Sequence, residues 1–132
     1  MKPLAAAWVA IAATCAAAGD AIEAPLAVRG DAGRGRSVFV QREQGHCVTC
    51  HRLDGILPAS NVGPALDGVG ARLSAAQLLQ RIVDITVVKP DAAMPAFHRR
   101  DGLSRVAVAY AGKTLLDAQQ VEDLVAFLSE RK

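Results

Sequence analysis

The sequence predicts an all-α fold in which short helices are joined by long loops. Ser74 and Asp117 are each followed three residues later by Gln, a capping-box pattern that starts a helix, and apolar residues recur at helical spacing after both. Around the paired cysteines, by contrast, no run of residues alternates as a β-strand does. Because residues 31–132 show no internal repeat, they are expected to form one domain.

The first helix is expected to begin at the N-cap Asp31 and to run to about Arg42. Its expected buried residues are Val38 and Phe39. Gly33 and Gly35 give this helix a face without side chains, although glycine weakens a helix. At Gly35 in particular, we therefore expect the backbone of another element to pack closely.

The middle and last helices are each expected to bury one apolar face. The face of the middle helix consists of Leu78, Leu79, Ile82 and Val83. The last helix is expected to end near Ser129, with a face that consists of Val121, Leu124, Val125, Phe127 and Leu128. Its charged residues are then expected to face solvent, namely Glu122, Asp123 and Glu130.

Residues 47–51 read Cys-Val-Thr-Cys-His, the C-x-x-C-H pattern at which a c-type haem is attached. The two thiols lie one short turn apart, so each can form a thioether with a vinyl group on the same edge of a porphyrin. His51 follows at once and can give its imidazole to the iron. The motif therefore predicts one covalently bound haem c, held by Cys47 and Cys50.

The alternative interpretation of this motif is a thiol-disulfide centre or a zinc site. A zinc site needs four ligands, and the other candidates, Cys15, His46 and His98, form no second metal-binding pair. A haem also suits the sparse core, which a large apolar macrocycle would fill. After residue 18, aromatic bulk comes only from Phe39, Phe97, Tyr110 and Phe127.

Residues 1–18 have the features of a secretory signal peptide. Lys2 precedes an apolar run from Leu4 to Cys15, and the alanines at positions 16–18 form an A-x-A cleavage site. The run is shorter than the roughly 20 residues that a membrane span needs, so we expect export to the periplasm without a membrane span. Lipidation of Cys15 stays open as an alternative to its removal with the signal.

Residues 19–30 are Ala-rich and contain Pro25, which predicts a flexible lead-in that a partner can hold. Loss of Lys2 with the signal lowers the formal net charge from +2 to about +1, and the chain has no basic block. Nucleic acid is therefore not an expected partner. Four dispersed arginines are candidates for the rim of an exposed haem edge, namely Arg42, Arg52, Arg99 and Arg100.

Two loops, residues 52–73 and 86–114, are left to supply the other haem contacts. Metal-bound histidines usually donate their second N–H to an oxygen atom, and the turn at Gly63 and Pro64 can place a backbone carbonyl beside His51 for this purpose. An ordinary surface turn is the other interpretation of the same residues.

Met94 is the one methionine besides Met1. It lies in a loop just before a proline, and its soft thioether predicts the sixth iron ligand. A methionine that merely fills a gap in the core is the alternative. His98 and His46 compete for the sixth position, although His46 adjoins the attachment site and is too near that edge to reach the distal face.

The chain resembles the SoxX family, the monohaem cytochrome c subunits of the SoxAX complex in sulfur oxidation. The resemblance is carried by residues 45–51, 61–66, 94–97 and 112–128. The last stretch is the most specific, because every c-type cytochrome has the haem motif. Asp117 stands where the family often has Thr, a change that preserves the capping chemistry.

The resemblance implies a class I cytochrome c fold, with thioethers at Cys47 and Cys50, His51 as the proximal ligand and Met94 as the distal ligand. It also implies a heterodimer with a haem-bearing SoxA-type subunit, whose cysteine joins thiosulfate to a carrier protein. In this L-cysteine S-thiosulfotransferase complex the present chain would accept the released electrons and pass them to a downstream acceptor.

By itself the chain is not expected to be catalytic, since its mature form retains no free thiol. Two alternatives to the SoxX function remain. One is a soluble class I cytochrome c that serves another dehydrogenase or oxidase. The other is a haem enzyme or gas sensor with an open iron position.

Overall fold

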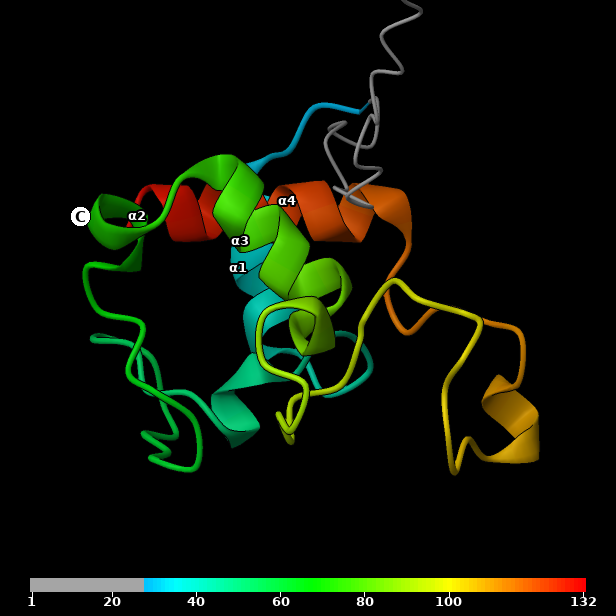
Figure 1. Cartoon of the computed structure of the whole chain (residues 1–132). Coiled ribbons are helices and arrows are strands. Elements are labelled where there is room, and N and C mark those ends of the chain that lie inside the picture. The colour runs from blue at the N-terminus through cyan, green and yellow to red at the C-terminus, as the bar shows by residue number, and fades with distance from the viewer. Residues whose placement is uncertain (1–27) are drawn as a thin grey trace, which may run out of the picture.

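The structure is a computed structural model that describes residues 28–132. The expected signal peptide, Cys15 and most of the lead-in lie outside the described residues. The described part contains the α-helices α1 (Ala32–Val40), α2 (Val69–Arg72), α3 (Ala75–Val83) and α4 (Ala118–Ser129), with short 3-10 turns at Cys47–Thr49, Ile85–Val87 and Val108–Tyr110 (Figure 1). Over residues 28–132 the only β-type pairing is one isolated bridge, between Leu53 and Ile56, so the all-α prediction is confirmed. Within this range no helix has the length and apolar character to cross a membrane.

The three expected helix starts are confirmed. The Asp31 carboxylate accepts a hydrogen bond from the backbone N–H of Arg34 at 2.8 Å, and α1 ends at Val40, slightly before the predicted end. Both capping boxes are closed at Ser74 and Asp117, because each cap and its Gln exchange side-chain to backbone hydrogen bonds.

The core forms where α4 packs against both α1 and α3 (Figure 1). The rings of Phe39 and Phe127 meet there with centroids 5.7 Å apart. Gly35 is buried, and a Cβ atom at this position would collide with the backbone carbonyl of Asp123 on α4, so the predicted close packing is present at Gly35. Gly33 on the same helix is exposed.

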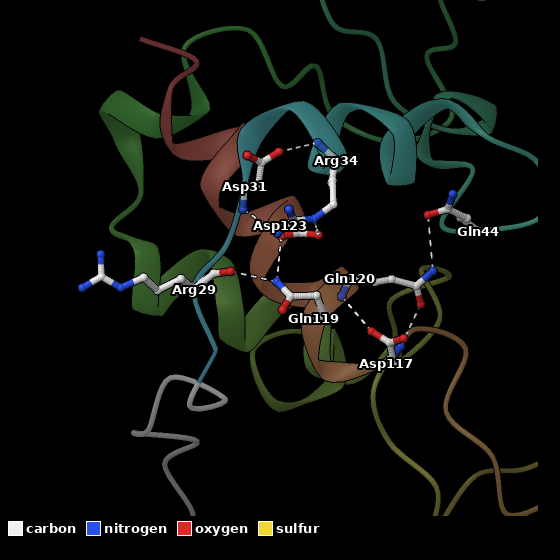
Figure 2. A network of polar contacts seen from close by, with 8 residues as sticks. All are labelled: Arg29, Asp31, Arg34, Gln44, Asp117, Gln119, Gln120 and Asp123. Carbon is white, nitrogen blue, oxygen red and sulfur yellow. Dashed lines mark hydrogen bonds and ion pairs between the residues drawn. The ribbon is translucent and has the colours of Figure 1, made fainter.

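The expectation that Glu122 and Asp123 face solvent is wrong. Glu122 is buried, and Asp123 is only 2% exposed. The Asp123 carboxylate accepts hydrogen bonds from the Asp31 backbone N–H at 2.7 Å, from the Arg34 guanidinium at 2.7 and 2.8 Å, and from the Gln119 side chain at 2.9 Å (Figure 2). These donors replace the water that a carboxylate loses on burial, so the network joins the start of α1 to α4.

Tyr110 was also expected in the core, and it is 57% exposed. It lies on a segment, residues 99–115, that projects from the helices as an arm (Figure 1). The aromatic residues that do reach the core are therefore Phe39, Phe97 and Phe127.

Replacing Asp123 with Asn is expected to destabilise the protein by about 2 kcal/mol at neutral pH, because it removes a charge-assisted bond between α1 and α4. Burial acts to raise the pKa of Asp123, but hydrogen bonds from Arg34, the Asp31 backbone and Gln119 outweigh burial and hold the pKa below its ordinary value. A depressed pKa gives stability that is present above the unfolded-state pKa, about 3.9, and is lost as pH falls through the lower folded-state pKa. Urea unfolding at pH 7 and pH 3 measures this, and the difference between the two proteins should shrink at pH 3.

The matched control is Glu130→Gln, which removes an exposed carboxylate at the C-cap of α4 that pairs with Arg131 at 3.2 Å. It is expected to change stability by less than about 0.5 kcal/mol. Equal effects of the two substitutions would contradict the assigned role of Asp123.

Candidate haem-binding site

An apolar cavity of about 420 Å³ lies among all four helices and the two long loops. Of the residues predicted to bind a cofactor, Cys47, His51, Pro64 and Met94 line this cavity. Cys50 does not line it and is half-buried, one short turn beyond Cys47. Most of the remaining lining is aliphatic or aromatic, including Phe39, Leu78, Ile82 and Phe97.

The paired cysteines lie on the 3-10 turn Cys47–Thr49. The Cys47 carbonyl accepts hydrogen bonds from the backbone N–H groups of Cys50 at 3.1 Å and His51 at 2.9 Å, and Val48 anchors the turn in the core. Cys47 and Cys50 form no disulfide with each other, and burial raises the pKa of the Cys47 thiol to about 12. The Cys47 thiol is therefore protonated at neutral pH, whereas the attacking cysteine of a redox motif has a lowered pKa. This environment does not favour the thiol-disulfide interpretation.

His51 is held by the loop that follows the motif. Its Nδ1 lies 2.7 Å from the carbonyl oxygen of Pro64. A carbonyl can only accept, so Nδ1 carries the hydrogen and the lone pair of Nε2 is free to bind a metal. The loop is fixed against the motif by two backbone bonds, from Gly63 to the Cys50 carbonyl at 2.7 Å and from Leu66 to the Arg52 carbonyl at 2.9 Å.

Because Gly63 has no side chain, the His51 ring can occupy the space beside the backbone at this position. A Cβ atom at position 63 would lie 2.6 Å from Cε1 and 2.9 Å from Nδ1 of His51. We expect Gly63→Ala to displace the ring or the loop, to shift the reduction potential and to destabilise the protein by about 1–3 kcal/mol. Potentiometry and thermal unfolding measure both effects. Asn61→Ala, at an exposed position of the same loop, is the control, and a Gly63 variant that behaves like it would show that the loop is not the support of His51.

The three candidates for the sixth iron ligand differ in their surroundings. Met94 is half-buried and packs against the hydrophobic core while lining the cavity. His98 does not line the cavity, and its Nδ1 lies 2.8 Å from the Leu116 carbonyl oxygen, to which it donates. His46 is also outside the lining, with its Nδ1 2.8 Å from the Thr49 hydroxyl. Of the three candidates for the sixth ligand, Met94 is therefore the one that the fold brings to the cavity with His51.

The cavity is also lined by two arginines that were not predicted to lie at the haem, Arg72 and Arg81. Arg72 donates to the Ala65 and Asp67 carbonyls, and Arg81 donates to the Gln77 carbonyl at 2.9 Å. The four arginines expected at the haem edge do not line it. Instead, Arg52 pairs with Asp67 at 2.9 Å and Arg99 with Asp84 at 2.7 Å.

These residues fit a haem c. The apolar wall suits the macrocycle, the imidazole and thioether suit its iron, and the two guanidinium groups suit its two propionate carboxylates. Cys47 and Cys50 supply the thiols for attachment. Within residues 28–132 no three His, Cys, Asp or Glu side chains gather as a metal-binding group of the kind that a zinc site uses.

The model of the cytochrome c family matches residues 32–132, and the chain belongs to this family. It is a monohaem c-type cytochrome with the cytochrome c fold, and its haem c is covalently bound at Cys47 and Cys50.

Known proteins that are similar to the chain include the following two. The crystal structure of SoxXA from P. pantotrophus contains a chain that is 32% identical, with a TM-score of 0.76, over 85% of this chain and 90% of that one. A cytochrome c-553-like protein from Synechocystis sp. is 40% identical over 58 residues, which is 44% of this chain. The match covers about half of that relative, 49% of its length.

Proposed function

We propose that this cytochrome is the SoxX subunit of a SoxAX-type complex in the periplasm and that it carries electrons released by thiosulfate oxidation. The observation that supports this most strongly is the similarity to a chain of the SoxXA crystal structure, which extends over most of both chains. The proposed partner is a haem-bearing SoxA-type subunit that contains the catalytic cysteine. A carrier protein and a downstream electron acceptor complete the system.

The proposed reaction releases electrons that this chain can accept only one at a time. Joining thiosulfate to a carrier thiol forms one sulfur–sulfur bond and releases one proton and two electrons. When bound, the haem supplies a one-electron iron couple. Because Cys47 and Cys50 are consumed as thioethers, neither can act as the nucleophile, and the bond-forming step is assigned to the partner.

The residues around the cavity support electron transfer in three ways. The Pro64 carbonyl fixes the orientation of the His51 ring through Nδ1, which keeps Nε2 directed for ligation. Met94 offers a thioether, a ligand that stabilises ferrous over ferric iron and so raises the reduction potential. The aliphatic wall around both residues keeps water away, which limits reorganisation when the charge of the site changes.

A second candidate function is that of a general class I cytochrome c that serves another dehydrogenase or oxidase. The local similarity to the cytochrome c-553-like protein supports this second candidate. The two functions share every haem residue and differ in the partner.

Purification of the tagged chain from a periplasmic extract separates the two functions. The SoxX proposal predicts that a second haem-bearing subunit comes with it in equal amount and remains bound through gel filtration. Recovery of the cytochrome alone, with rapid reduction by a different dehydrogenase, would support the second function instead.

A further inference from the structure

The loop that carries Met94 is closed at its two ends by one salt bridge. Asp84 ends α3, and its carboxylate lies 2.7 Å from the guanidinium of Arg99. Residues 85–98, which lie between Asp84 and Arg99, form a compact loop that contains Met94 and whose two ends lie close together. Asp84 is 6% exposed, so the pair is largely removed from water on the carboxylate side.

The same two side chains also fix the chain on either side of the loop. The Asp84 carboxylate accepts hydrogen bonds from the backbone N–H of Thr86 at 2.9 Å and from its hydroxyl at 2.6 Å, which holds the entry turn. Arg99 donates to the carbonyls of Asp101 at 2.7 Å and Gly102 at 3.1 Å, which holds the exit.

The end of the loop is aligned on α3 by backbone hydrogen bonds. Phe97 donates to the Ile82 carbonyl and His98 to the Val83 carbonyl, both at 3.2 Å. Phe97 itself lines the cavity beside Met94. The salt bridge follows these hydrogen bonds directly in both chain segments, so it helps to hold residues 97–98 against the end of α3. The position of Met94 depends on this contact.

Replacing either Asp84 or Arg99 is expected to let the two ends of the loop separate. Without Arg99, the buried Asp84 carboxylate keeps only the Thr86 donors, and an under-compensated buried charge favours conformations in which water reaches it. Burial acts to raise the pKa of Asp84, yet the bonds from Thr86 and Arg99 outweigh it and keep the pKa below its ordinary value, so the carboxylate is ionised at neutral pH.

We propose that Asp84 and Arg99 are positioning residues that hold the Met94 thioether at the haem iron by closing the loop between them. Neither residue lines the cavity, so both act through the loop and not by contact with the cofactor. The inference rests on the proposed ligation by Met94.

The loop also contains a matched control. Lys89 and Asp91 form an ion pair at 3.1 Å, but their side chains are 62% and 81% exposed and they are two residues apart. This pair cannot join the ends of the loop, and an exposed pair contributes little to stability.

The experiment uses the ferric holoprotein with Arg99→Gln, Asp84→Asn, Arg99→Lys and the control Lys89→Gln. Two properties are measured. The first is the loss of the near-infrared sulfur-to-iron band on heating, compared with global unfolding followed by far-ultraviolet circular dichroism. The second is the affinity for imidazole, which competes with Met94 for the iron. We expect the band of Arg99→Gln and Asp84→Asn to fade below the temperature of global unfolding and imidazole to bind at least tenfold more tightly. Lys89→Gln should match the wild type. Arg99→Lys should lie between, because lysine keeps the charge but lacks the planar fork.

Arg99→Gln would overturn the proposal if it lowered the unfolding temperature but left the band and the imidazole affinity unchanged, because the pair would then be purely structural. Should Asp84→Asn not fold, the two Arg99 variants decide the question. A wild-type holoprotein that lacks the band would overturn the ligation by Met94 itself, and a wild type with the band but insensitive variants would overturn the positioning role alone.

Discussion

A variant in which both Cys47 and Cys50 are replaced by alanine is expected to lose cooperative folding. Without covalent attachment the haem is not retained, and the protein must close a cavity of about 420 Å³. At about 24 cal/mol per Å³, an unfilled cavity of that size costs roughly 10 kcal/mol, which is comparable with the whole stability of a domain, about 5–15 kcal/mol. Urea titration followed by circular dichroism measures this.

The control for this experiment is Cys50→Ala alone. Cys50 does not line the cavity, and the thioether at Cys47 would remain. We expect this protein to keep its haem and to unfold cooperatively. A sharp unfolding transition of the haem-free double variant would contradict the view that the haem completes the core.

Replacing Met94 with Ala is expected to leave the haem content intact but to change the iron site. The near-infrared band should vanish, cyanide and imidazole should bind, and the reduction potential should fall, because water or His98 stabilises ferrous iron less than a thioether does. Electron acceptance within the proposed SoxAX-type complex should then fail. Spectroscopy and potentiometry of the purified protein measure these changes, with Val87→Ala, at an exposed position of the same loop, as the control.

An unchanged potential and spectrum in the Met94 variant would show that the ligand assignment is wrong. His98 would then be tested next, although its Nδ1 is engaged with the Leu116 carbonyl. Ready binding of cyanide by the wild-type protein would instead favour the alternative of a haem enzyme or gas sensor with an open iron position.

The helix starts could be predicted because a capping box is local: Ser74 and Asp117 meet their partners within one turn. Asp123 could not be placed in the same way, because the donors that permit its burial come mainly from α1, at the opposite end of the described chain. Helical spacing identifies the apolar face of a helix, but it does not indicate which charged side chains form ion pairs with distant residues. The helix α2 has four residues and was not predicted, since so short an element has no periodicity to detect.

In the candidate site, too, the residues that belong to a local sequence pattern could be predicted, and those placed by tertiary packing could not. The roles expected of Cys47 and His51 follow from a pattern of adjacent residues, and the expectation for Met94 from its residue type and place in a loop. Arg81 lies three residues after Leu78, on the inward side of α3, so its approach to the cavity could have been inferred from helical spacing. Arg72 could not, because its position depends on how α2 packs. The closure by Asp84 and Arg99 likewise becomes visible only when the two ends of the loop are seen together.

The proposed SoxX function requires that this cytochrome receive electrons from thiosulfate through a complex with its partner, and the near-infrared band can report this transfer. The ferric chain is combined with the haem-bearing partner and the carrier protein, thiosulfate is added, and the near-infrared band is followed, because a methionine-ligated haem shows it only in the ferric state. We expect the band to bleach with all components present, to persist when the partner or the carrier is omitted, and to bleach with dithionite in every case. A band that persists in the complete mixture yet bleaches with dithionite would show that the proposed SoxX function is wrong.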